Sequence, residues 1–224
     1  DGGIALLMVG RLDEARKVME DVSLEFELLG YGRGTTVSLT NLSAIDVLLG
    51  AFAQAKTTGI EALASARSMG LRFEEVLALQ NISAACTRLG ETEEALRYSA
   101  ECVTLARALE LASEIAPSLE SAALALLSAK RYAEARIVID ECVGIVRRDQ
   151  TAVRDPSTGF WAAAQIYRKL RNHRQARAFL SEAADTLRKQ LADMPDDECR
   201  DAYRRMPFSL EIEAAAERDQ WPTW

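Results

Sequence analysis

The stretch "LGYGRGTT" at residues 29–36 is the first whose residue types suggest chemistry, because it places three glycines beside an arginine and two threonines. Glycine-rich loops can hold phosphate groups where they lead into the N-terminus of a helix. A nucleotide-binding loop needs G-x-x-x-x-G-K-[ST], and a dinucleotide-binding loop needs G-x-G-x-x-G after a strand. The stretch has no lysine and matches neither spacing. We therefore interpret it as a turn between two helices, with an anion site at the second helix as the alternative.

The other reactive side chains form no pattern that is typical of catalysis or metal binding. His173 is the only histidine, and the cysteines stand far apart with no C-x-x-C pair. They are Cys86, Cys102, Cys142 and Cys199. Zinc sites need such ligands in closely spaced groups, and a nucleophile needs an aligned base. We expect no metal, no cofactor and no enzymatic activity.

Basic residues are concentrated in "RKLRNHRQAR" at residues 168–177. They are Arg168, Lys169, Arg171, Arg174 and Arg177. Such a group can hold a phosphate or an acidic segment, or it can be a solvated turn that offsets acidic neighbours. The whole chain has a formal net charge of −7, which argues against general binding to nucleic acid or acidic membranes.

An internal repeat organises most of the 224 residues. A short polar turn followed by an alanine recurs at intervals of 40 residues, and a fifth copy comes one residue late. The alanines are Ala15, Ala55, Ala95, Ala135 and Ala176. Each interval divides into two amphipathic stretches of about 17 to 20 residues, such as 33–50 and 51–70. This pattern predicts helix pairs joined by short turns, with glycines such as Gly30 and Gly70 ending helices.

Small residues recur at two further positions of the repeat, where the helices of a pair must approach closely. Seven residues after each alanine stand Val22, Ala62, Cys102, Cys142 and Ala183, and twelve before it stand Gly3, Ser43, Ser83, Ala123 and Ala164. This pattern resembles the tetratricopeptide repeat family over about residues 1–190. The resemblance implies an all-α, right-handed solenoid of about five helix pairs, with the first pair truncated. The period of 40 exceeds the usual 34, so we expect longer helices.

Residues 191–224 leave the repeat pattern, and we expect them to form capping helices and a tail. The segment "PDDECRDAYRRMPFSLEI" resembles the closing segment of tetratricopeptide regions in bacterial multidomain signalling ATPases and transcriptional regulators. Arg200, Tyr203 and Pro207 carry this resemblance. It implies that the chain is the C-terminal arm of a larger bacterial regulator. The start at Asp1, within a helical pattern, agrees with that expectation.

Candidate binding residues lie on the first helix of each pair, the A helix, which we expect to line the concave wall. Asn41 and Asn81 occupy the same repeat position, and the resemblance implies that they hydrogen-bond the backbone of an extended peptide. Asparagines on a helix without a ligand are the alternative. The neighbouring candidates are Thr40, Ala44, Gln80, Ala84, Leu124 and Trp161. Trp161 is expected either to anchor a partner or to be buried by packing.

These features predict a non-catalytic scaffold that binds a protein or peptide in its groove. A small-molecule sensing module of a signalling ATPase or transcription regulator is the alternative. The sequence has no apolar run of the roughly 20 residues that a membrane span needs, and no signal segment, so we expect a cytoplasmic location. The aromatic "WPTW" at residues 221–224 leaves open self-association through a neighbour's groove.

Overall fold

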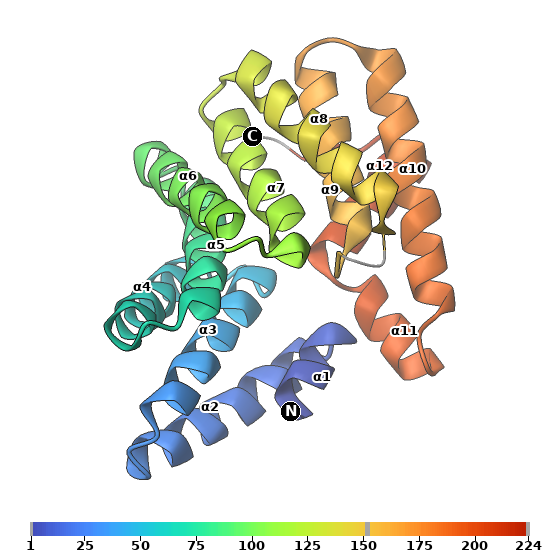
Figure 1. Cartoon of the computed structure of the whole chain (residues 1–224). Coiled ribbons are helices and arrows are strands. Elements are labelled where there is room, and N and C mark those ends of the chain that lie inside the picture. The colour runs from blue at the N-terminus through green and yellow to red at the C-terminus, as the bar shows by residue number, and fades with distance from the viewer. Residues whose placement is uncertain (1, 151–152, 223–224) are drawn as a thin grey trace. The chain divides into compact units, whose positions relative to one another are not determined.

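The structure is a computed structural model that describes residues 2–150 and 153–222 (Figure 1). It contains twelve helices and no strand within those residues. The chain divides into two compact units, one ending at Cys102 and the other beginning at Val103, so the division falls inside one helix. The fold is all-α, as predicted.

The first unit consists of helices that pack on their neighbours along the chain. They are α1 (Gly2–Met8), α2 (Leu12–Leu28), α3 (Gly32–Leu48), α4 (Phe52–Met69), α5 (Arg72–Leu89) and most of α6 (Thr92–Ala108). Helix α3 packs on both α4 and α5, so consecutive A helices also touch each other. The stretches predicted at 33–50 and 51–70 are confirmed as α3 and α4.

The second unit continues the same alternation and then adds two shorter helices. It contains α7 (Ala112–Ser128), α8 (Tyr132–Arg148), α9 (Pro156–Lys169), α10 (His173–Ala192), α11 (Asp197–Arg204) and α12 (Pro207–Arg218). Helices α7 and α8 form one pair, and α9 and α10 form the next. Helices α11 and α12 both contact α10, the position that a capping segment would occupy.

Most turns between helices contain a residue with left-handed backbone geometry. Such residues are Gly10, Gly30, Gly50, Gly70, Gly90, Glu110, Lys130 and Arg171. At Gly30 φ is 65°, and the next N–H, of Tyr31, donates to the carbonyl oxygen of Phe26 at 2.8 Å. This bond closes the end of α2, as in a Schellman cap. Gly30 therefore lies in a helix-to-helix turn, as the sequence predicts.

Two glycines with open surroundings offer a test of this backbone requirement. A Cβ added at Gly30 or at Gly144 meets nothing within 4 Å, but only Gly30 has a positive φ. We expect Gly30→Ala to lower the free energy of unfolding by about 1 kcal/mol because of left-handed strain. Gly144→Ala, inside α8, is expected to raise it by about 0.5 to 1 kcal/mol. Urea denaturation checks both, and the same sign for both variants would contradict the explanation.

The small-residue positions make equivalent contacts in successive repeats. The Ser43 hydroxyl donates to the carbonyl oxygen of Ala55 at 2.8 Å, and Ser83 donates to Ala95 at 3.2 Å. At the second small-residue position, seven residues after the alanine, thiols make the equivalent bond. The Cys102 thiol donates to the carbonyl oxygen of Val76 at 3.5 Å, and the Cys142 thiol donates to that of Ala116 at 3.3 Å. All four side chains are buried. Packing between helices therefore accounts for Cys102 and Cys142.

From α4 onward, ion pairs link each B helix, the second helix of a pair, to the next B helix. The pairs are Arg67–Glu101, Arg107–Glu141 and Arg147–Glu182. Their arginines recur at intervals of 40 residues. Because these side chains are between 35% and 50% exposed, each pair contributes only about 0.2 to 1 kcal/mol.

The tail residues that carry the second resemblance have defined structural roles. The Arg200 guanidinium donates to the carbonyl oxygen of Leu191 at 3.1 Å, near the end of α10. Tyr203 is buried, and Pro207 begins α12. These contacts hold the tail helices on the last pair. The residues Thr223 and Trp224 of the "WPTW" segment lie outside the described residues.

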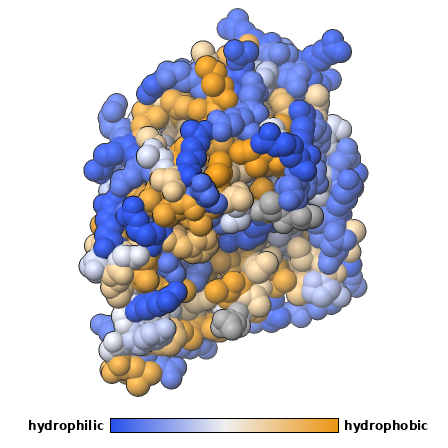
Figure 2. Space-filling view, viewed as in Figure 1, coloured by the Kyte–Doolittle hydropathy of each residue, from blue (hydrophilic) through white to orange (hydrophobic). Residues whose placement is uncertain are grey.

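Apolar side chains are exposed where α2 turns into α3. Leu24, Leu28, Leu29 and Tyr31 are between 51% and 89% exposed. Figure 2 shows hydrophobic surface at this end of the first unit, at the lower left. Among the described residues, no helix combines the length and the apolar character that crossing a membrane requires.

Candidate peptide-binding face

The two asparagines predicted to bind a peptide have different partners in the structure. On α3 the Asn41 amide donates to the carbonyl oxygen of Val37 in its own helix at 3.0 Å. On α5 the Asn81 amide donates to the carbonyl oxygen of Thr40 at 2.9 Å, and so joins consecutive A helices. An asparagine carries two N–H donors and an oxygen acceptor. Among the described residues, Asn41 and Asn81 each use one N–H, and their second N–H and their amide oxygen have no hydrogen-bond partner.

The other predicted residues are divided between the two units. Thr40 is buried, and its hydroxyl donates to the carbonyl oxygen of Thr36 at 2.9 Å. Ala44, Gln80 and Ala84 are half-buried on α3 and α5. The structure thus brings Thr40 and Asn81 into contact in the first unit. Leu124 on α7 and Trp161 on α9 belong to the second unit.

Trp161 is covered by the tail of its own chain. Its side chain is buried, and the indole N–H donates to a carboxylate oxygen of Glu211 on α12 at 3.0 Å. The ring of Trp221 stacks on it, with ring centroids 5.3 Å apart and planes inclined by 26°. Trp161, expected either to anchor a partner or to be buried by packing, is therefore packed against an aromatic residue that follows α12.

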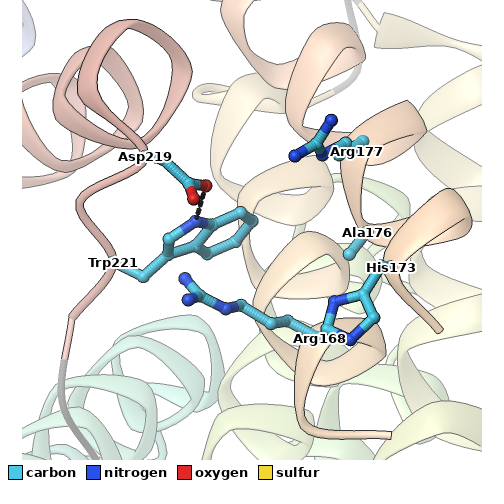
Figure 3. Close-up of a pocket in the computed structure, with 6 residues that line it drawn as sticks. All are labelled: Arg168, His173, Ala176, Arg177, Asp219 and Trp221. Atoms are coloured by element: carbon cyan, nitrogen blue, oxygen red, sulfur yellow. Dashed lines mark hydrogen bonds between the residues drawn. The ribbon is translucent and has the colours of Figure 1, made fainter. Parts of the chain in front are cut away.

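A pocket of about 210 Å³ lies beside this stack (Figure 3). It is lined by Arg168, His173, Ala176, Arg177, Asp219 and Trp221. The Arg168 guanidinium lies over the Trp221 ring, 4.4 Å from its centroid. The Trp221 indole N–H donates to Asp219 at 2.8 Å. Figure 3 shows the basic side chains coming from the end of α9 and the start of α10, and the acidic one from the tail.

The charges in this pocket are unbalanced. The Trp221 indole, and then the positive charges of Arg168 and Arg177, hold the pKa of Asp219 below its usual value. Nη1 of Arg168 is buried and has no hydrogen-bond partner in the described part of the chain. Of the basic residues in the 168–177 segment, Arg168 and Arg177 line the pocket, and Arg174 does not.

One group of possible metal ligands is present among the described residues, at Cys86, Glu91 and Glu94. The Lys56 ammonium contacts both carboxylates, and its distance to Glu91 is 2.7 Å. Burial, and then the nearby Glu91, raise the pKa of the Cys86 thiol to about 12, so it remains protonated. Because the Lys56 ammonium already pairs with both carboxylates, we interpret this group as an ion pair joining α4 to α6.

Comparison with known proteins gives a structural match but no sequence match. No family model matches the chain, and neither does any curated protein. A crystal structure of a putative kinesin light chain from Podosopora anserina, with nearly identical TPR-like repeats, is similar at a TM-score of 0.60 and 16% identity. The match covers 85% of this chain and 93% of that one. At this identity the likeness concerns the fold alone, and it shows that the chain folds as TPR-like helical repeats.

Proposed function

We propose that the chain is a non-catalytic module that binds a protein or peptide segment on its A helices. The repeat fold carries this proposal, because TPR-like arrays generally serve as interaction scaffolds. The unused donor and acceptor groups of Asn41 and Asn81 support it, since a carboxamide can pair with both groups of a peptide backbone. Thr40, Ala44, Gln80 and Ala84 would border the same site in the first unit, and Leu124 and Trp161 are candidate contacts on the A helices of the second unit.

The finer part of the proposal is that the module is the C-terminal arm of a larger bacterial regulator in the cytoplasm. The resemblance of residues 195–212 to the closing segments of such proteins supports it. The contacts of Arg200 and Tyr203 give those residues a structural reason to recur, because they attach the tail to the last helix pair.

Selection from a displayed library of random peptides tests the binding function without a known partner. We expect the chain to enrich peptides, and the Asn41→Ala/Asn81→Ala variant to bind them about 1 to 3 kcal/mol more weakly by calorimetry. Gln54→Ala, which removes an amide from the B helix α4, is the matched control and should leave binding unchanged. Unchanged affinity of the double variant would remove the asparagines from the site, and a library that enriches nothing would contradict the function.

The pocket at Arg168 favours the second candidate function, sensing of a small molecule. Its volume of about 210 Å³ and its basic lining would fit a small anionic metabolite. A ligand of the native state raises apparent stability, so a thermal-shift screen of metabolites checks this candidate. An upward shift that Arg168→Ala abolishes would favour sensing over peptide binding.

A further inference from the structure

The segment that follows α12 occupies the second unit in the way that a bound peptide would. Helix α12 ends at Arg218, and Asp219 adopts left-handed geometry with φ of 53°. The Gln220 N–H donates back to the carbonyl oxygen of Ala214 at 3.1 Å. The chain then places the Trp221 ring on Trp161 and under the Arg168 guanidinium. An aromatic ring and a carboxylate two residues apart thus fill one side of the pocket.

This occupant leaves the pocket incompletely satisfied. About 210 Å³ remains open between the tail and the start of α10. Two arginines and His173 line it, against the single carboxylate of Asp219. The buried Nη1 of Arg168 lacks an acceptor, although a charged donor gains much from pairing with a carboxylate. A ligand with more acidic groups than the chain's own tail would supply that acceptor.

We propose that the face formed by Trp161, Arg168, His173 and Arg177 is a docking site for an acidic peptide segment containing a tryptophan, and that residues 219–221 occupy it within the same chain. The proposal rests on the peptide-binding function above and names the chemistry of one ligand. The tryptophan supplies the stacking surface, and acidic residues on its N-terminal side reach the two arginines.

A peptide is favoured over a free anion because the pocket walls combine rings and charges. Stacking on Trp161 and a cation–π contact with Arg168 both need an aromatic group. The indole of Trp221 also donates to Asp219, so the ring and the carboxylate are held together before they meet the arginines. A small oxyanion would use only the arginines and would leave the apolar face of Trp161 uncovered.

The test is binding of a fluorescein-labelled peptide with the sequence of residues 215–222, "AAERDQWP", to the full chain. Trp221→Ala releases the internal competitor, so this variant should bind the peptide at least about tenfold more tightly than the unchanged chain, because a tethered segment has a high effective concentration. A peptide with glutamate in place of Arg218 and Gln220 should bind more tightly still. A peptide with alanine in place of its tryptophan should not bind.

Variants of the arginines locate the site. In the Trp221→Ala background, Arg168→Ala should abolish peptide binding, and Arg177→Ala serves as a second variant if the first fails to fold by circular dichroism. Arg174→Ala lies in the same basic segment outside the pocket and should change nothing. Equal affinity of Trp221→Ala and the unchanged chain would overturn the proposal, and so would absence of binding to either.

Two further results distinguish this proposal from a free-anion site and from peptide binding elsewhere on the chain. Displacement of the peptide by inorganic phosphate, with no dependence on the peptide's tryptophan, would mean a free-anion site and would overturn the peptide assignment. Library peptides that bind equally well to Arg168→Ala would preserve the proposed scaffold function while overturning this site. Gln54→Ala, on the B helix α4 and outside both proposed sites, should leave binding of the 215–222 peptide unaffected.

Discussion

Replacing Tyr203 with alanine is expected to lower the free energy of unfolding by about 3 to 5 kcal/mol, as for other large buried rings. Tyr203 on α11 is 2% exposed, and its ring meets Phe208 edge to face with centroids 5.6 Å apart. Its hydroxyl donates to Asp155, before α9, at 2.6 Å and accepts from the Gln190 amide at 2.8 Å. The variant therefore loses both the packing and the bonds that join α11 to α9 and α10.

Tyr203→Phe separates those two contributions. It keeps the ring but removes the hydroxyl, so Asp155 loses a donor and Gln190 loses an acceptor. We expect a smaller loss of about 1 to 3 kcal/mol. Urea denaturation followed by circular dichroism measures both variants, with attention to partial transitions, because repeat arrays can unfold in parts. An alanine variant as stable as the unchanged chain would contradict the attachment of the tail through Tyr203.

Spacing alone predicted the helices of the repeat and most of their turns, because the residues that end a helix recur every 20 positions from Gly10 to Lys130. Gly10, Gly30, Gly50, Gly70 and Gly90 all have positive φ, and each is a residue type that accepts it. The residue type predicts the turn less clearly where another residue stands in place of glycine. Glu110 and Lys130 hold the left-handed geometry without glycine, and only their positions in the repeat indicate it.

Contacts between helices could not be predicted from the repeat spacing. Arg67, Arg107 and Arg147 recur at intervals of 40, but their pairing with glutamates 34 or 35 residues later depends on the distance between consecutive B helices. The bond from Asn81 to Thr40 likewise depends on how closely α3 and α5 approach. The candidate residue identities were visible in the sequence, whereas their partners were not.

The packing of Trp221 on Trp161 is another contact that the sequence did not predict, between residues that are far apart in the chain. Trp161 was expected to be an anchor or a packing residue, and the basic segment at 168–177 was expected to hold an acid or to be solvated. The tail places Trp221 on Trp161, and it places Asp219 in the pocket lined by Arg168 and Arg177. Nothing in the local pattern of residues 219–222 indicates where that segment folds, because its contacts lie some 40 to 60 residues away.

Glu120 on α7 is a carboxyl group that the structure favours in its protonated form. Burial raises the pKa of Glu120 to about 7. The hydrogen bond from Thr158 opposes this rise, and the charge of Asp155 adds to it. The hydroxyl of Thr158 lies 2.7 Å from Glu120 Oε2 and 2.8 Å from the carbonyl oxygen of Asp155, yet it has one hydrogen. A protonated Glu120 can donate to Thr158, which then donates to Asp155. An ionised Glu120 competes with that carbonyl oxygen for the single hydrogen.

The raised pKa predicts a loss of stability as the pH rises. The native state keeps the proton on Glu120 until about pH 7, whereas the unfolded chain releases it near the ordinary value of 4.5. The free energy of unfolding should therefore fall between these values by about 1 to 3 kcal/mol and then stay level. Glu120→Gln stays neutral at every pH, so we expect it to be more stable than the unchanged chain at pH 8 and similar at pH 4.5. Glu217→Gln, an exposed change on α12, controls for net charge. Urea denaturation curves at several pH values compare them, and parallel profiles for Glu120→Gln and the unchanged chain would show that Glu120 is ionised in the fold.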